Sequence, residues 1–261
     1  MNYTTIKYNK DNQVGTISFN RPEIHNAFNA TVIDEMLSLF DAIITDENLR
    51  IVILTGEGKS FCAGADLNWM RSVVNQSYEE NLNESNRLAE LFHKIYSFPR
   101  PVIGKINGAA IGGGTGFVAV CDISIAAESA KFSFSEVKIG VVPACIGPYV
   151  IKKMGEGKAR ELFITGERMN AERAYNVGLV NSFVADGNLD EAVDSLVNSV
   201  LSSGPEAVAM AKKLVSTVPG MTPEQFKPYT AEMIAKLRIS DEGQEGMDAF
   251  LNKRKPKWVK E

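Results

Sequence analysis

Two short turns rich in small residues are the parts of the sequence whose residue types and spacing could do chemistry. One is Ala63-Gly64-Ala65-Asp66 and the other is the triple glycine Gly112-Gly113-Gly114. Small residues let a substrate approach the backbone, and glycine permits dihedral angles that aim N–H groups outward. A helix that begins at such a turn adds amides without intrahelical acceptors and the positive end of its dipole. Two such amides aimed at one point would form an oxyanion hole, which suits the enolate of a thioester.

Other functions of these two glycine turns fit the sequence less well than an oxyanion hole does. Either turn alone is equally consistent with tight packing between a strand and a helix. A dinucleotide-binding turn of the GxGxxG type is the main alternative, and Glu128 could serve as its ribose-binding acid. When the motif is counted from Gly112 and Gly114, however, its third glycine falls on Phe117. Together, the two turns at comparable strand ends favour the oxyanion hole.

Nucleophilic hydrolysis lacks its usual residues in this chain. The two histidines are His25 and His93, and there is no GxSxG sequence. His93 lies in a helical run, Leu91-Phe92-His93-Lys94-Ile95, where a packed or partly exposed histidine is the ordinary explanation. A serine or cysteine protease is therefore disfavoured.

Glu136 is the candidate for moving protons. It follows a short strand-like segment, is flanked by apolar residues and precedes Gly140-Val141-Val142-Pro143. Loss of hydration in such surroundings raises the pKa of a carboxyl group towards the range useful for proton transfer near neutrality. A solvated glutamate at a strand end is the alternative interpretation.

The elements that must position these residues alternate between strands and helices. Strands are predicted at 14–19, 51–54, 101–106 and 123–127, the second of them buried on both faces. A helix capped by Asn29 extends to Ile44, another covers 79–97, and a buried one lies around 117–120. This order indicates an α/β architecture with much parallel pairing. After about Gly155 the strands are predicted to stop, and helices follow at 157–165, 170–177, 189–203, 205–217, 222–238 and 241–252.

Bulk properties narrow the range of functions. The 261 residues are 44% hydrophobic and 23% charged, and the net charge of -4 argues against a nucleic-acid partner. Cys62, Cys121 and Cys145 are too scattered for a disulfide framework or a zinc site, which favours a reduced, cytoplasmic setting without a bound metal. The N-terminal residues 1–6 do not resemble a signal peptide, and no apolar run is long enough to span a membrane.

Taken in order, these segments resemble the crotonase (enoyl-CoA hydratase/isomerase) superfamily over nearly the whole chain. The most specific stretches are Phe61-Cys62-Ala63-Gly64-Ala65-Asp66-Leu67 and Asn107-Gly108-Ala109-Ala110-Ile111-Gly112-Gly113-Gly114. Cys121-Asp122 follows at the usual distance, and the resemblance runs from Asn20-Arg21-Pro22 with His25-Asn26-Ala27 to Ala249-Phe250-Leu251-Asn252-Lys253-Arg254.

The resemblance implies an α/β fold of the ClpP/crotonase type, a spiral of ββα units (residues 1–200) with a helical C-terminal trimerisation region (201–261). It implies that the amides of Ala65 and Gly113 form the oxyanion hole and that Glu136 is the acid/base. The substrate would be an acyl-CoA thioester, with no separate cofactor, and the assembly a homotrimer or a hexamer of two trimers. Residues that match the CoA-binding stretches are His25, Ala27, Ala63, Asp66 and Leu67, together with Phe250 and Lys253, a pair that commonly reaches the CoA of a neighbouring subunit.

One departure from the family pattern leaves the reaction open. Hydratases of the best-known kind carry a second glutamate on the helix after the triple glycine, where this chain has Gly116. A single carboxylate suffices for a Δ3,Δ2-enoyl-CoA isomerase. A non-catalytic acyl-CoA-binding protein is a third possibility, against which the intact Glu136 argues.

Several further segments resemble the methylglutaconyl-CoA or carboxygeranoyl-CoA hydratase branch, members of which also carry glycine at that position. The sequence therefore predicts an enoyl-CoA hydratase-type enzyme, with a branched or carboxylated enoyl-CoA of leucine or isoprenoid breakdown as a candidate substrate. Tyr149 is a candidate helper or a packing residue. The segments that carry this resemblance are Asn68-Trp69-Met70, Phe134-Ser135-Glu136-Val137, Val142-Pro143, Pro148-Tyr149 and Ser240-Asp241-Glu242-Gly243-Gln244-Glu245-Gly246.

Overall fold

Two β-sheets form the framework of the first of two units into which the chain divides. The computed structural model describes residues 3–259. Met1 and Asn2, which begin the N-terminal stretch 1–6 that does not resemble a signal peptide, lie outside the described residues. The first unit comprises the chain up to Phe98 and Val102–Val193, and the second comprises Pro99–Pro101 and the chain from Asp194 onward. Each unit is described by itself below.

The larger sheet has the strand order β1-β2-β3-β5-β7-β10. β1 and β2 form an antiparallel hairpin, and every other neighbouring pair in this sheet is parallel. All six residues of β3 are buried, as expected for a strand covered on both faces. The strands are β1 (Ile6–Asp11), β2 (Val14–Phe19), β3 (Ile51–Gly56), β5 (Val102–Ile106), β7 (Ile123–Ala127) and β10 (Ser182–Val184).

The smaller sheet consists of three-residue strands in the order β4-β6-β8-β9. β4, β6 and β8 run parallel to one another, and β9 pairs antiparallel with β8. The carboxyl ends of the three parallel strands therefore meet at one edge of this sheet, where ligands bind in many parallel sheets. The strands are β4 (Ser60–Cys62), β6 (Ala109–Ile111), β8 (Lys131–Ser133) and β9 (Arg168–Asn170).

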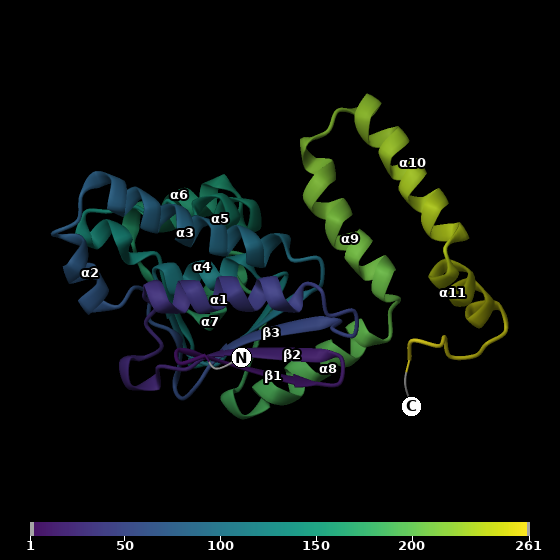
Figure 1. Ribbon diagram of the computed structural model, residues 1–261, viewed down its shortest axis with the longest axis horizontal. Helices are drawn as coiled ribbons and strands as arrows, with labels where there is room; N and C mark the ends of the chain where they lie inside the picture. Colours follow the sequence, from purple (N-terminus) through teal and green to yellow (C-terminus); the bar gives the residue numbers. More distant parts are fainter. Residues whose placement is uncertain (1–2, 260–261) are drawn as a thin grey trace. The chain divides into compact units, whose positions relative to one another are not determined.

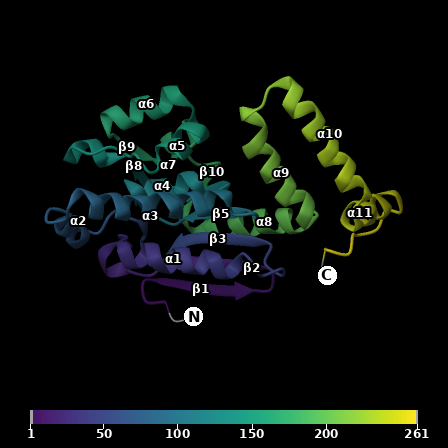
Figure 2. The same ribbon diagram turned by 45° about the horizontal axis from the view of Figure 1, so that its top comes forward.

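Helices with defined caps cover these sheets. The Asn29 side chain accepts a hydrogen bond from the Val32 amide at the start of α1 (Ala30–Ile43), and Ser77 and Glu80 form a capping box at the start of α3 (Tyr78–Ser97). α1 and α3 pack side by side (Figure 2). α4 (Gly113–Val120) is buried over nearly its whole length. The other helices that begin in this unit are α2 (Leu67–Val73), α5 (Gly147–Met154), α6 (Glu156–Thr165), α7 (Ala171–Asn176) and α8 (Leu189–Leu201).

The second unit is helical. It contains α9 (Pro205–Thr217), α10 (Pro223–Ile239) and α11 (Asp241–Leu251), and α9 and α10 run in opposite directions (Figure 1). The carboxylate of Glu242 accepts hydrogen bonds of 2.8 Å from the amides of Glu206 and Ala207, which caps the first turn of α9 with a negative charge from α11. None of the helices in the described part of the chain is long and apolar enough to cross a membrane.

The α/β class and the predominance of parallel pairing are confirmed. The expectation that strands stop after about Gly155 is wrong, because β9 and β10 both follow that residue. Each has three residues, and in β9 only Met169 is buried, so neither could show the alternation by which a strand is recognised.

Candidate active site

The three parallel strands of the smaller sheet each deliver one part of the candidate site. β4 leads to the turn that contains Ala65, and β6 leads through Gly112 to Gly113, the first residue of α4. β8 leads to a short 3-10 helix, Ser135–Ile139, that carries Glu136. Residues far apart in sequence therefore meet at one sheet edge.

The two glycine turns are packed directly against each other. Gly64 has a φ of 95°, and a Cβ atom there would lie 2.7 Å from the carbonyl oxygen of Ile111. Across the same contact, a Cβ atom on Gly114 would overlap the carbonyl oxygen of Cys62. Glycine at both positions therefore allows the β4 turn and the start of α4 to approach to backbone contact.

The amides of Ala65 and Gly113 are placed to donate to a bound group. Phe28 bonds to the two neighbours of Ala65, because its amide donates to the Gly64 carbonyl and its carbonyl accepts from the Asp66 amide, both at 2.8 Å. Successive amides alternate in direction along extended backbone, so the Ala65 N–H points away from Phe28. The Gly113 N–H belongs to the first turn of α4, where no intrahelical acceptor exists. Ala65 and Gly113 line the same cavity.

Glu136 lies beside this pair of amides. A Cβ atom on Gly112 would lie 3.3 Å from Glu136 Oε1, so the φ of 54° and missing side chain of Gly112 make room for the carboxyl group. Within the described part of the chain, Glu136 Oε2 is buried and has no hydrogen-bond partner. Burial raises the pKa of Glu136 above its ordinary value. The group is therefore suited to holding and releasing a proton.

The cavity that these residues share has a volume of about 510 Å³ and a largely apolar lining. Glu136 is the one acidic side chain of that lining, which contains no lysine or arginine among the described residues. Helix α3 contributes Ser85, Leu88 and Phe92, and α2 contributes Trp69 and Met70. The cavity thus combines one proton carrier, two backbone donors and space for an apolar group.

Ile146 occupies the space into which a side chain at position 116 would project. Gly116 is fully enclosed in α4, and a Cβ atom there would overlap Ile146 Cγ2 and lie 3.2 Å from Phe92 Cε1. A carboxylate at this position therefore requires a smaller residue than Ile146. The single-carboxylate character of the site is built into its packing.

The residues matched to CoA binding are distributed unevenly around the cavity. Ala63 and Leu67 line it, and Leu67 is 70% exposed. His25 is exposed in a left-handed conformation, with its Nδ1 atom 3.1 Å from Ser60 Oγ. Ala27 is buried, and neither His25 nor Ala27 is part of the cavity lining.

Asp66 has a structural role that the sequence did not indicate. Its carboxylate accepts from the Asn68 amide at the start of α2 and from Arg21 Nη2, both at 2.7 Å. Burial alone would raise the pKa of Asp66, but these two contacts outweigh burial and hold it below its ordinary value. Phe250 and Lys253 belong to the second unit, and Phe250 is 83% exposed.

Several lining residues were not singled out from the sequence. Gly112 was recognised as the first residue of the glycine run but not as the neighbour of Glu136, and the positions of Trp69 and Ile146 depend on contacts between distant segments. Tyr149 is not part of the lining and packs on Tyr96 with ring centroids 5.0 Å apart, which supports its role in packing.

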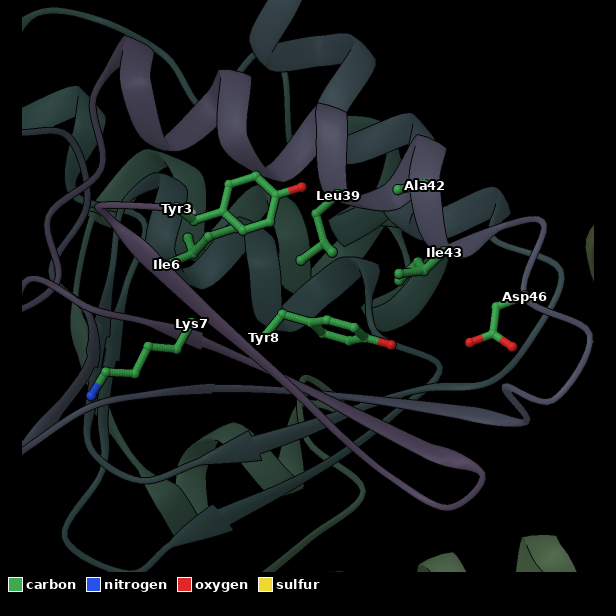
Figure 3. A pocket seen from close by; sticks show the side chains of 8 residues that line it. All are labelled: Tyr3, Ile6, Lys7, Tyr8, Leu39, Ala42, Ile43 and Asp46. Atoms are coloured by element: carbon green, nitrogen blue, oxygen red, sulfur yellow. The ribbon is translucent and has the colours of Figure 1, made fainter. Parts of the chain in front are cut away.

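A second hollow lies between β1 and α1 (Figure 3). Figure 3 shows Tyr8 from β1 below Leu39 and Ile43 from α1. The charged residues at this hollow have ionic partners, because Lys7 pairs with Glu57 at 2.9 Å and Asp46 with Lys10 at 2.5 Å. Its described lining does not combine outward-facing amides with a carboxyl oxygen that has no partner, as the first cavity does.

Known proteins resemble this chain over nearly its whole length. The family model described as enoyl-CoA hydratase/isomerase matches residues 9–261. The chain is 32% identical to a crotonyl-CoA hydratase of Syntrophomonas wolfei, with 99% of each chain covered. A crystal structure of an enoyl-CoA hydratase from Shewanella pealeana superimposes with a TM-score of 0.94 at 38% identity, covering 98% of this chain and 96% of the other. Pseudomonas aeruginosa AtuE superimposes with a TM-score of 0.96 at 29% identity, covering 98% and 100%. The expected crotonase-type fold is confirmed.

Proposed function

The chain belongs to the enoyl-CoA hydratase/isomerase family, and we propose that it adds water to, or removes it from, the 2,3 double bond of an enoyl-CoA through Glu136, Ala65 and Gly113. The observation that carries this assignment is the placement of Glu136. Its carboxyl group lies against Gly112, next to the first amide of α4, and one of its oxygens has no partner among the described residues. A proton carrier beside two free donors is what reversible enolate formation requires.

In the proposed reaction, the thioester carbonyl oxygen accepts hydrogen bonds from the amides of Ala65 and Gly113. Glu136 takes a proton from water as the water oxygen bonds to C3, and the electron pair of the double bond moves through C2 to the carbonyl oxygen. The same carboxyl group then gives its proton to C2, which restores the thioester. Each amide donor to such an oxyanion typically contributes about 3 kcal/mol to catalysis.

The lining of the cavity bears on the identity of the acyl group. A branched or carboxylated enoyl-CoA is the candidate from the sequence, and a buried carboxylate would need a cationic or multiply hydrogen-bonding partner. The described lining offers no lysine or arginine. This favours an uncharged, branched or short acyl group over 3-methylglutaconyl-CoA.

Isomerisation is the second candidate, and the contact between position 116 and Ile146 favours it. Because Ile146 fills the place of a second carboxylate, the described lining offers water a single carboxylate, that of Glu136. A Δ3,Δ2-enoyl-CoA isomerase needs no water: Glu136 would remove a proton from C2 of a 3-enoyl-CoA and return it to C4.

One absorbance measurement separates the two reactions. Purified protein is mixed with crotonyl-CoA, 3-methylcrotonyl-CoA, 3-methylglutaconyl-CoA or 3-hexenoyl-CoA, and the absorbance of the conjugated enoyl thioester is followed. It falls on hydration of a 2-enoyl-CoA and rises on isomerisation of a 3-enoyl-CoA. No change with any substrate, despite measurable binding of CoA compounds, would indicate a non-catalytic acyl-CoA-binding protein.

The Glu136→Gln variant tests the assignment of the acid/base. We expect kcat to fall by about 10²–10⁴-fold, with little change in the dissociation constant of butyryl-CoA, because the amide keeps the shape but cannot exchange the proton. The exposed Glu79→Gln on α3 is the matched control. Unchanged turnover in Glu136→Gln would show that another group moves the proton.

Binding of the CoA portion and assembly remain part of the proposal. The residues assigned to CoA are His25, Ala27, Ala63, Asp66, Leu67, Phe250 and Lys253. The C-terminal helices, residues 201–261, are proposed to form the contacts of a homotrimer, alone or paired into a hexamer.

A further inference from the structure

Trp69 is the largest side chain that α2 contributes to the cavity. None of the seven residues of α2 is fully buried, and Trp69 is the residue of this helix that packs, partly buried, against the core of the first unit. Polar contacts supplement this packing. At its N-terminus the Asp66 carboxylate caps the Asn68 amide and binds Arg21.

Glu84 of α3 supplies the second attachment of this segment. One oxygen of its carboxylate accepts a hydrogen bond from the indole N–H of Trp69, and the other accepts one from the side-chain Nε2 of Gln76, both at 3.0 Å. Ser85 and Leu88, on the same helix, line the cavity. A carboxylate that receives both donors fixes the orientation of the indole ring as well as its position, since hydrogen bonds to ionised acceptors are the stronger kind.

The indole ring of Trp69 is also connected to the oxyanion site, through Phe28. Trp69 and Phe28 meet edge to face, with ring centroids 5.7 Å apart. The ring of Phe28 lies against Gly113, because a Cβ atom there would approach Phe28 Cζ to 2.7 Å. The row of contacts therefore runs from Glu84 through Trp69 and Phe28 to one of the two proposed amide donors.

We infer that the indole ring of Trp69 limits the size of the acyl group that the cavity accepts, and that Glu84 is the positioning residue that fixes the orientation of this ring. The inference rests on the proposed function, since it assumes that the acyl chain of a CoA thioester occupies this cavity. Glu84 is not part of the lining and acts through the indole ring. Removing its carboxylate should therefore change the choice among acyl groups more than the binding of CoA itself.

The experiment uses binding of saturated acyl-CoA compounds, which does not depend on turnover. The chain has two tryptophans, Trp69 and Trp258, and Trp258→Phe leaves Trp69 as the only indole fluorophore. Butyryl-, hexanoyl- and octanoyl-CoA are titrated while the tryptophan emission is recorded, and free CoA serves as the reference. We expect the emission of Trp69 to respond to the acyl compounds and to change little with free CoA. If Trp258→Phe folds poorly, the difference in emission between the unaltered protein and Trp69→Phe gives the same signal.

Variants then separate specificity from structural support. Trp69→Ala should raise the affinity for octanoyl-CoA relative to butyryl-CoA by about tenfold, because the space of the ring becomes available to further methylene groups. Glu84→Ala should shift this ratio in the same direction, and Glu84→Gln, which keeps an acceptor for the indole N–H, should restore it. Glu79→Ala, which removes an exposed carboxylate from the same helix, should leave the ratio unchanged.

A ratio of affinities that stays constant in Trp69→Ala would overturn the inference, as would equal responses of Trp69 emission to free CoA and to acyl-CoA. Weakened binding of all compounds by one common factor in Glu84→Ala would assign Glu84 to structural support alone. Failure of the proposed function gives a different result: emission would still depend on acyl length, and no enoyl-CoA would be turned over.

Discussion

Glu136 links catalysis to stability at the scale of a single residue. Its buried oxygen without a partner favours the neutral carboxylic acid, since an ionised carboxylate would lose hydration without gaining a counter-charge. The folded protein therefore binds this proton more tightly than the unfolded chain does. The contribution of Glu136 to stability is present at pH values below its unfolded pKa and is lost as the pH rises through the raised pKa of the folded state.

The Glu136→Gln variant should therefore be more stable than the unaltered protein at neutral and alkaline pH. The advantage should vanish at pH values below the ordinary pKa of glutamate, where the carboxyl group is neutral in both the folded and the unfolded state. Urea unfolding at a series of pH values measures the difference in free energy of unfolding. An advantage that does not depend on pH would contradict the assigned cause, and Glu79→Gln serves as the exposed control.

The contact between position 116 and Ile146 gives a second prediction at this scale. Gly116→Glu should lower the free energy of unfolding by about 1–3 kcal/mol, because the new side chain overlaps Ile146 and approaches Phe92. Combining it with Ile146→Ala should recover part of this loss, so the two changes should not be additive. Chemical denaturation of both single variants and the double variant completes the cycle. Strict additivity would show that Ile146 is not the obstacle.

At the scale of elements, Thr115 ties α4 to two strands of the smaller sheet. Its buried Oγ1 atom lies 2.6 Å from the carbonyl oxygen of Ala110 and 3.0 Å from that of Ser133. The hydroxyl proton is shared between the ends of β6 and β8, which carry the glycine run and Glu136. The Thr115 side chain, which is not part of the cavity lining, therefore adds to the bond from the Gly112 amide to the Ser133 carbonyl in aligning the Gly113 amide with the carboxyl group.

Thr115→Val should lower the free energy of unfolding by about 1–3 kcal/mol, because two buried carbonyl groups lose a donor while the shape is kept. We also expect kcat to fall more than the affinity for butyryl-CoA, since the oxyanion donor moves relative to Glu136. Thr115→Ser, which keeps the hydroxyl, should recover both quantities. A fall in stability with kcat unchanged would confine Thr115 to folding.

Element length explains which parts of this architecture could be predicted from the sequence. The helices α1 and α3 and the buried strand β3 were predicted because each has an apolar pattern long enough to show its period. Three-residue strands such as β4 and β6 are too short for any period, although they place both glycine turns. α2 was missed because its seven residues make fewer than two full turns, too few to show a helical period.

The same reasoning applies to the candidate site. The small residues around Ala65 and Gly113 and the apolar surroundings of Glu136 are local features visible in the sequence, and these three residues line one cavity in the structure. The closure of position 116 by Ile146 and the bond from Trp69 to Glu84 join segments that the chain brings together only after folding. Local patterns therefore suggested the candidate residues, whereas the proposed limits on substrate and mechanism required the packed structure.

At the scale of the whole molecule, the second unit exposes large apolar side chains. Val215 of α9 is 74% exposed and Ile239 of α10 is 79% exposed, and Leu251 at the end of α11 is 77% exposed. Exposed apolar side chains of this kind often belong to a surface that contacts another chain. Together with the resemblance of the C-terminal region, this supports the proposed trimer.

Light scattering of the purified protein should therefore give a mass of three or six times the chain mass of 28.5 kDa. Ile239→Glu should lower that mass, because a carboxylate buried between subunits would lose hydration without a partner. Lys227→Glu, at an exposed position of α10 that is already charged, is the control. If Phe250 and Lys253 reach the CoA of a neighbouring subunit, the dissociated variant should also bind CoA more weakly than the control does. A mass of one chain for the unaltered protein would exclude this assembly and, with it, any contribution of a neighbouring subunit to the site.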